Sequence, residues 1–91
     1  MQKNSRPGHL YRPHPGEVLK RRYIDKSPLT QHEIAVRLGI NTNQLSCFIN
    51  CNCDLTLELA KKLELVSGIS SAAWMNYKIA YDIYKAADLS N

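Results

Sequence analysis

The segment from Thr30 to Asn41 restricts the fold of this chain more than any other, because it ends one helix and begins another within a few residues. Thr30 and Glu33 have the spacing of a capping box, which starts a helix. Gly39 suits the left-handed backbone that ends a helix, and Asn41 can cap the next one. The pattern therefore predicts two helices joined by a tight turn at Gly39.

Apolar residues on both sides of this turn indicate how the two helices pack. Ala35 permits a close approach of the helices. Five larger side chains can fill the angle between them: Ile34, Leu38, Ile40, Leu45 and Phe48. The combination is typical of a helix-turn-helix motif, here at about 31–50, in which the second helix enters the major groove of DNA. The open alternative is an ordinary helical hairpin with a glycine turn.

The segments before and after this motif predict three further helices. Pro15 suits a first helical position, and the helix it begins should run to about Asp25. Thr56 and Gly68 bracket another helix as its cap and its stop. A last helix should span about 71–87. With the two helices of the motif, the chain is predicted to be all-α with five helices.

Length and proline content set the domain organisation. Residues 1–13 contain Pro7, Gly8 and Pro13 and lack helical periodicity, so we expect an extended basic arm. A chain of 91 residues can bury one modest core and no more. We therefore predict a basic N-terminal arm over 1–13 and a single helix-turn-helix domain over 14–91.

The last predicted helix has two apolar faces. One face is aromatic and carries Trp74, Tyr77, Tyr81 and Tyr84. The other face carries Met75, Ile79, Ile83 and Ala86. A small domain can cover one of them, and an uncovered apolar face usually marks a protein contact. We expect a homodimer whose interface includes Met75, Ile79, Tyr81 and Ile83, unless the preceding helices wrap both faces.

The outward residues of the second motif helix are polar and could read base edges. They are Asn41, Thr42, Asn43, Gln44, Ser46 and Cys47. The amides of Asn and Gln can each form two hydrogen bonds with adenine. From the preceding helix, Gln31 can donate to a phosphate and Arg37 can supply a positive charge. The alternative for each of these side chains is plain exposure to solvent.

A net charge of +4 favours a polyanionic partner, but the cations are unevenly distributed. Residues 1–26 hold seven Lys and Arg side chains, whereas residues 38–60 hold none. Because phosphate neutralisation supplies most non-specific affinity for DNA, Arg37, Lys61, Lys62 and the N-terminal region would have to provide it. We expect weak binding by a monomer. A protein-interaction module that keeps the fold with little operator binding is the alternative.

Cys47, Cys51 and Cys53 lack the spacing and the four ligands of a zinc site. We expect free thiols, no metal and no cofactor, with metal binding or redox sensing as the alternative. No nucleophile or acid–base pair has a catalytic arrangement, so an enzyme is not expected. No apolar run approaches the roughly 20 residues that cross a bilayer, and the N-terminus lacks a secretory signal. We expect a cytoplasmic protein without a membrane partner.

Three parts of the chain resemble the HigA antitoxins, which belong to the phage-repressor-like helix-turn-helix proteins. They are HPGEVL at 14–19, LTQHEIAVRLGI at 29–40, and the pair WMN at 74–76 and AYD at 80–82. The resemblance covers about residues 13–85. It implies a five-helix DNA-binding domain and a dimeric antitoxin that represses its own operon. It also implies a toxin partner of the RelE-like class, which cleaves mRNA on the ribosome.

Two places depart from the pattern of these relatives. Cys47 stands where they tend to carry Arg, and Cys51-Asn52-Cys53 stands where they carry residues like Gly-Lys-Arg. Asn50 is retained, which favours the same exit from the helix. We therefore expect the affinity for an operator, or the operator sequence, to differ from theirs.

Overall fold

A computed structural model describes residues 11–89 of the chain, and most of the predicted basic arm lies outside them. The described part contains helices and no strand. Their bounds are α1 (Pro15–Leu19), η1 (Lys20–Ile24), α2 (Gln31–Leu38), α3 (Thr42–Ile49), α4 (Leu57–Ser67) and α5 (Ser71–Leu89). Helix η1 is a π-helical continuation of α1, so the two form the single predicted first helix. The all-α prediction is confirmed.

Local hydrogen bonds explain where α2 and α3 begin and end. The Thr30 hydroxyl accepts from the Glu33 backbone N–H at 3.1 Å, and the Glu33 carboxylate accepts from the Thr30 N–H at 2.8 Å. Gly39 ends α2 in the left-handed region, with φ 75°. The Asn41 side chain accepts from the Gln44 N–H at 2.7 Å and caps α3. The predicted capping box, turn and cap are confirmed.

The start of α1 packs unusually close to the end of α3. His14 caps α1, because its Nδ1 accepts from the Gly16 N–H at 2.8 Å. A Cβ on Gly16 would lie 1.8 Å from the Phe48 carbonyl oxygen, so only glycine fits between the two backbones. The His14 ring is buried and makes edge contacts with Phe48 and Tyr81. The HPG segment therefore joins three helices at one point.

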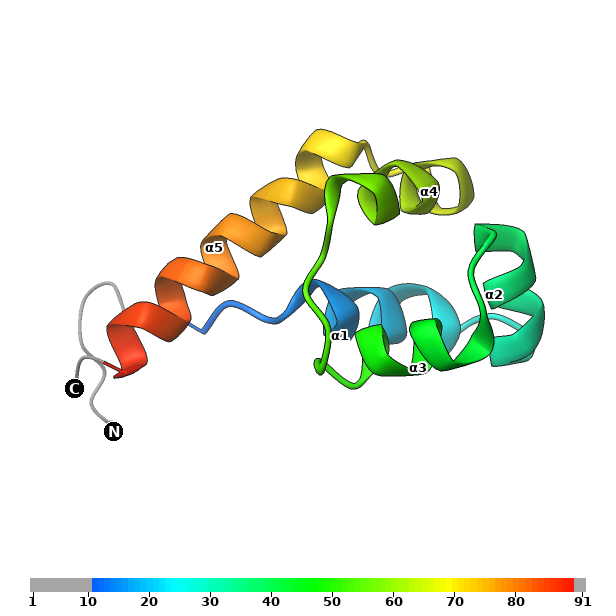
Figure 1. Cartoon of the computed structure of the whole chain (residues 1–91), viewed down its shortest axis with the longest axis horizontal. Helices are drawn as coiled ribbons and strands as arrows, with labels where there is room; N and C mark the ends of the chain where they lie inside the picture. Colours follow the sequence, from blue (N-terminus) through cyan, green and yellow to red (C-terminus); the bar gives the residue numbers. More distant parts are fainter. Residues whose placement is uncertain (1–10, 90–91) are drawn as a thin grey trace.

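Helices α1 to α4 surround the core, and α5 extends away from it as a long helix (Figure 1). The largest fully buried side chains include Trp74, Phe48, Leu19, Leu45, Leu55 and Leu63. Trp74 anchors the start of α5, and its Nε1–H donates to the Ser67 hydroxyl at 3.2 Å. The Tyr23 hydroxyl donates to the Ser67 carbonyl at 2.9 Å, so Ser67 links η1, α4 and α5.

The preceding helices do not wrap both faces of α5. Ile79 and Ile83 are 53% and 64% exposed, on the outer side of the helix. Met75 and Tyr81 were grouped with them in the predicted dimer interface, but the structure separates the set. Met75 is half-buried against the core, and the Tyr81 ring lies 5.0 Å from the His14 ring. The helical periodicity of the sequence could not show that His14 would pack against the side of α5 on which Tyr81 lies.

Candidate nucleic-acid interface

A tight, apolar joint holds α2 and α3 at a fixed angle. The Ile40 N–H donates to the Ala35 carbonyl at 3.0 Å, and the Gly39 N–H donates to the Val36 carbonyl at 3.1 Å. Ala35, Leu38, Leu45 and Phe48 are buried at this joint, and Ile40 is half-buried beside it. Because one side of α3 is held by the core, its other side presents a rigid surface.

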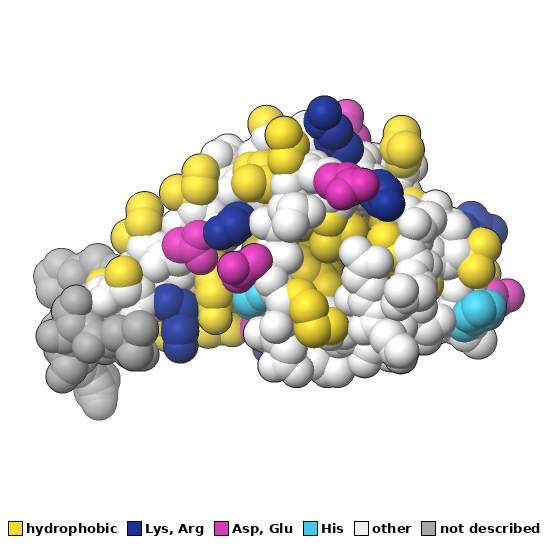
Figure 2. Space-filling view, in the orientation of Figure 1, with side chains coloured by type: hydrophobic (Ala, Val, Ile, Leu, Met, Phe, Trp, Pro, Cys, Tyr) yellow, Lys and Arg dark blue, Asp and Glu magenta, His cyan; other side chains and the backbone are white. Residues whose placement is uncertain are grey.

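The outward side of α3 is polar and carries no charge. Asn41, Asn43 and Gln44 are exposed, whereas Thr42 and Ser46 are half-buried. The side-chain amides of Asn43 and Gln44 have no hydrogen-bond partner among the described residues. In Figure 2 the surface over this helix is mostly polar and uncharged, in contrast to the charged and apolar upper edge.

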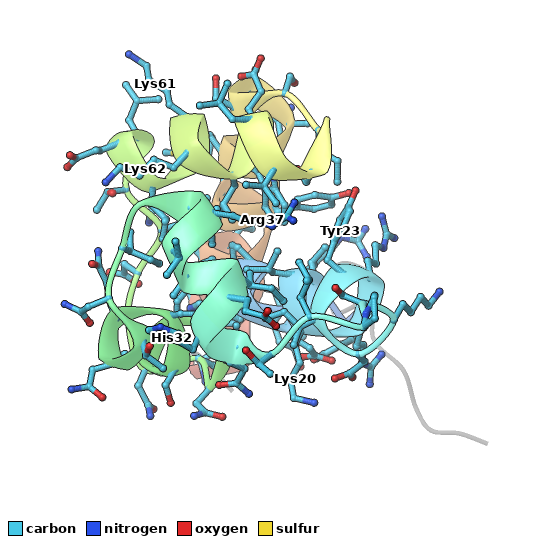
Figure 3. All side chains as sticks on the ribbon, turned by 90° about the vertical axis from the view of Figure 1, so that its right-hand side faces the viewer. Lys20, Tyr23, His32, Arg37, Lys61 and Lys62 are labelled. Atoms are coloured by element: carbon cyan, nitrogen blue, oxygen red, sulfur yellow. A yellow bond between two sulfur atoms is a disulfide. The ribbon has the colours of Figure 1, made fainter. Side chains whose placement is uncertain are left out.

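His32 is a residue of this surface that the sequence reasoning missed. Its Nδ1 lies 3.0 Å from the Thr42 hydroxyl, so a hydrogen bond joins α2 to the first turn of α3. Figure 3 shows His32 on the side of α2 that faces α3. Gln31, one residue earlier, is exposed at the start of α2. The His32–Thr42 contact therefore links the start of α2 to the polar side of α3.

The structure does not bring Arg37 together with these residues. Arg37 is exposed on the other flank of α2, where it lines a pocket with Tyr23 and Val66 (Figure 3). Among the described residues, Lys62 is the cation that lies beside α3. It shares a shallow pocket with Gln44, and its Nζ lies 3.4 Å from the Gly39 carbonyl oxygen. Lys61 points away from α3 in Figure 3.

Acidic side chains lie near two of the helix starts on this surface. Glu33 is in the first turn of α2, and its hydrogen bonds with Thr30 lower the pKa of its carboxyl group. Glu58 is in the first turn of α4 and lies 4.0 Å from the Lys62 ammonium. Both carboxylates weaken the attraction of a helix start for phosphate. The positive potential of this surface is therefore modest.

The expectation of three free thiols is wrong. Cys47 and Cys53 form a disulfide with a Cα–Cα distance of 5.6 Å, and Cys51 is free and exposed. Cys51 has φ 65°, which turns the chain back after α3, and the Asn52 N–H donates to the Cys47 carbonyl at 2.9 Å. This reversal brings Cys53 beside Cys47. Cys47 is thus half-buried and bonded, and its sulfur is not a free reading group.

Two other properties of the described residues concern metal ions and membranes. No group of three or more His, Cys, Asp or Glu side chains there could hold a metal ion. None of the described helices combines the length and the apolarity needed to cross a bilayer.

Known proteins with similar sequences or folds include regulators and antidotes. An uncharacterized HTH-type transcriptional regulator of Escherichia coli strain K12, YbaQ, is 32% identical over 71 residues, which are 78% of this chain. The match covers 63% of YbaQ, so the chain spans less than two thirds of that relative. No model of a protein family matches the chain.

Two solved structures share the fold. One is an addiction module antidote protein of the HigA family from Coxiella burnetii, with 30% identity and a TM-score of 0.78. That match covers 89% of this chain and 88% of the antidote. The other is a Pseudomonas aeruginosa protein in complex with its 18 bp operator DNA, with 19% identity and a TM-score of 0.81. It covers 87% of this chain and 83% of that protein, and at this identity the likeness concerns the fold alone.

The relatives are transcriptional regulators and antidote proteins, which are not enzymes. Its helix-turn-helix joint, the His14–Gly16 contact with α3 and the extended α5 occur in a chain that matches the Coxiella antidote over nearly its whole length. The chain belongs to the HigA family of helix-turn-helix antidote proteins.

Proposed function

We propose that this chain is a cytoplasmic antitoxin that binds operator DNA through α3, represses its own operon and neutralises a RelE-like mRNA-cleaving toxin. One observation carries the DNA-binding part of the proposal. The Asn43 and Gln44 amides are exposed and have no partner among residues 11–89, on a helix whose opposite side is buried. The family resemblance supports the toxin partner.

Base reading by this helix follows from side-chain chemistry. The major groove is about 12 Å wide and admits one α-helix, whose first residues face the base edges. Asn43 and Gln44 can each form paired hydrogen bonds with adenine, and the Thr42 methyl can contact thymine. The hydrogen bond to His32 restricts the Thr42 side chain to one orientation. The proposed operator therefore contains A·T pairs at the contacted steps.

Positioning on the DNA backbone would come from the flanking elements. Gln31 and the first N–H groups of α2 can donate to a phosphate on one side of α3. Lys62 can contact a phosphate on the other side. Because one domain has few such contacts, two copies joined through α5 would bind an operator more strongly than one copy.

A titration by fluorescence anisotropy tests the DNA-binding proposal. The probe is a labelled duplex that carries the DNA upstream of the chain's own gene, and a random duplex of equal length is the competitor. Changing Asn43 and Gln44 to Ala should lower the discrimination between the two duplexes by about 1–3 kcal/mol per lost paired contact. Asn76→Ala removes an exposed amide from α5 and should leave the discrimination unchanged. Equal losses on both duplexes would refute base reading by α3.

Toxin neutralisation needs a separate experiment. The probe is the product of the reading frame next to this gene, expressed alone and together with this chain. Expression alone should stop growth with cleavage of mRNA on ribosomes, and co-expression should restore growth. Growth arrest that persists in the presence of the folded chain contradicts the antitoxin role.

The absence of charge on α3 favours one alternative function. A helix-turn-helix fold without a cation on its second helix, and with Glu33 and Glu58 nearby, could serve as a protein-interaction module. In that case the upstream duplex and the random duplex would compete equally even at low salt. The same titration therefore separates the two functions.

A further inference from the structure

The Cys47–Cys53 disulfide lies next to the proposed DNA-reading residues. Residues four apart in a helix are neighbours on one face, so Cys47 follows Asn43 by one turn on the outward side of α3. The bond therefore holds the segment that follows α3 against the C-terminal end of the outward side of α3.

Besides the disulfide, hydrogen bonds to α3 hold the segment 50–54, and Asn50 donates two of them to Ser46. The Cys51 and Asn52 N–H groups donate to the carbonyls of Phe48 and Cys47 at 3.0 and 2.9 Å. Leu55, the residue after this segment, is 2% exposed and anchored in the core. Any movement caused by opening the disulfide is thus confined to this short segment and the end of α3.

The location of DNA makes this bond unusual. A protein that acts on DNA works where thiol reductants keep most cysteines reduced, and the disulfides found there are mostly transient and redox-sensing. Both sulfurs belong to half-buried residues rather than to residues enclosed in the core. Partial desolvation of its sulfur raises the pKa of the Cys51 thiol, and the Glu17 charge adds to this effect while the Glu17 backbone opposes it, so Cys51 is a poor nucleophile for exchange with the neighbouring bond.

We propose that Cys47 and Cys53 form a reversible redox site, in which the disulfide holds the segment 50–54 against α3 and the dithiol releases it. This inference rests on the proposed DNA-binding function in two respects: the reducing surroundings of the bond, and the tighter binding of the operator by the disulfide form than by the dithiol form. The reason is preorganisation, because in the disulfide form the end of α3 is already ordered before it binds DNA.

The chemistry is thiol–disulfide exchange with a dithiol reductant. A thiolate of the reductant attacks one sulfur of the Cys47–Cys53 bond, a mixed disulfide forms, and the other cysteine leaves as a thiolate that takes a proton. The second thiol of the reductant, as a thiolate, then attacks the reductant's sulfur in the mixed disulfide, and the attached cysteine leaves as a thiolate that also takes a proton. The protein gains two electrons and two protons, and the reductant becomes a disulfide. Reoxidation by a disulfide of the glutathione class reverses each step.

The first measurement does not involve DNA. The full chain is equilibrated in glutathione buffers from reduced to oxidised, trapped with N-ethylmaleimide, and analysed by peptide mass spectrometry. We expect a Cys47–Cys53 disulfide in oxidised buffer, trapped thiols at both of these cysteines in reduced buffer, and full recovery of the disulfide when the chain returns to oxidised buffer. The Cys51 thiol should be trapped in both buffers. Hydrogen exchange at the Cys51 and Asn52 amides should accelerate on reduction. A pair that involves Cys51, no disulfide in oxidised buffer, or unchanged exchange would overturn the redox site.

The second measurement compares operator affinity of the two forms by anisotropy. The oxidised chain should bind about threefold to tenfold more tightly than the reduced chain, since a short disulfide-closed loop removes some of the freedom lost on binding. Cys53→Ser should bind like the reduced chain in both buffers, and Cys51→Ser should respond to redox state like the unmodified chain. Equal affinity of the two forms, or tighter binding by the reduced form, overturns the coupling.

The two measurements also separate this inference from the proposed function. If neither form prefers the operator while trapping and exchange behave as expected, operator binding fails and the redox site stands. If both forms prefer the operator equally, operator binding stands and the coupling fails.

Discussion

Gly16 is the residue at which a single carbon atom decides how two helices pack. The ideal Cβ position lies 1.8 Å from the Phe48 carbonyl oxygen and 2.7 Å from its carbonyl carbon, and both atoms belong to the backbone. A backbone cannot rotate away as a side chain can. Gly39 differs, because nothing lies within 4 Å of its Cβ position and only its φ of 75° disfavours other residues.

Gly16→Ala should therefore destabilise the fold more than Gly39→Ala. For Gly16→Ala we expect a loss of about 3 kcal/mol in the free energy of unfolding, at the upper end of the cost of overpacking. For Gly39→Ala we expect about 1–2 kcal/mol, the cost of a left-handed residue. Urea denaturation of both variants measures the difference. A milder effect at Gly16 would show that α1 can move away from α3 at little cost.

His14 should make the stability depend on pH. Burial lowers the pKa of its imidazole from 6.5, and the Cys53 backbone and nearby Asp54, Asp82 and Glu17 oppose this shift. The folded chain needs neutral His14, because protonation removes the Nδ1 acceptor for Gly16. Below pH 6.5 the unfolded chain binds more protons than the folded one, so stability falls as the pH falls below this value and is fully present above it.

The matched variant for this pH effect is His14→Asn, which keeps a helix-capping acceptor and cannot titrate. Urea denaturation at several pH values between about 5 and 8, the range in which histidine titrates, should show a steeper loss of stability in acid for the unmodified chain. Parallel curves for the two proteins would assign the acid sensitivity to other groups.

At the scale of elements, α3 depends on its neighbours for both position and charge. Its own residues supply caps, apolar packing and amides, while the cation beside it comes from α4. Lys62 lies next to Gln44, and Lys61, one residue away on the same helix, points elsewhere. Two adjacent lysines thus offer a matched pair for measuring where the phosphates lie.

Lys62→Ala should reduce the salt dependence of operator binding. Each neutralised phosphate contributes about 0.9 to the slope of log affinity against log salt concentration on duplex DNA. We expect Lys62→Ala to lower the slope by about that amount and Lys61→Ala to change it less. Anisotropy titrations at several salt concentrations give the slopes. Identical slopes for the two variants would remove Lys62 from the DNA surface.

At the scale of the whole molecule, α5 gives the protein its elongated shape, with principal extents of 42 × 25 × 22 Å. Its first turns are held by Trp74 in the core, and its outer side carries the exposed Ile79 and Ile83. We propose that this outer side joins two copies of the chain. A dimer would also present two α3 helices to one operator, which compensates for the weak charge of each domain.

Ile83→Asp should convert a dimer into folded monomers, because a desolvated carboxylate is costly at an apolar contact. Leu65→Asp, at an 88% exposed apolar position on α4, is the control and should leave the dimer intact. Sedimentation velocity measures the mass, and circular dichroism confirms that the variants fold. An unaltered mass for Ile83→Asp would reject α5 as the interface.

Tyr81→Asp should act differently from Ile83→Asp, although both residues were predicted to lie in the dimer interface. The Tyr81 ring packs on His14, so a carboxylate there should mainly lower the free energy of unfolding. Thermal denaturation at a fixed protein concentration measures this loss. A variant that stays as stable as the unmodified chain but becomes monomeric would place Tyr81 in the interface after all.

The sequence alone was sufficient for the helices, their caps and the helix-turn-helix joint. Thr30 with Glu33, Asn41 with Gln44, and Gly39 act through hydrogen bonds and backbone preferences that span only a few residues, so the local sequence contains the information. The family could be inferred for a related reason. Gly16 of the HPG segment is needed for the close packing of α1 on α3, so this requirement is visible in the sequence.

The tertiary structure decided which residues share a surface. Lys62 rather than Arg37 lies beside α3, His32 meets Thr42, Tyr81 meets His14, and Cys53 returns to Cys47. Helical periodicity places a side chain on a face of its own helix, but it does not say which distant segment covers that face. That depends on how the helices cross and where the chain turns back, and both follow from packing the whole core.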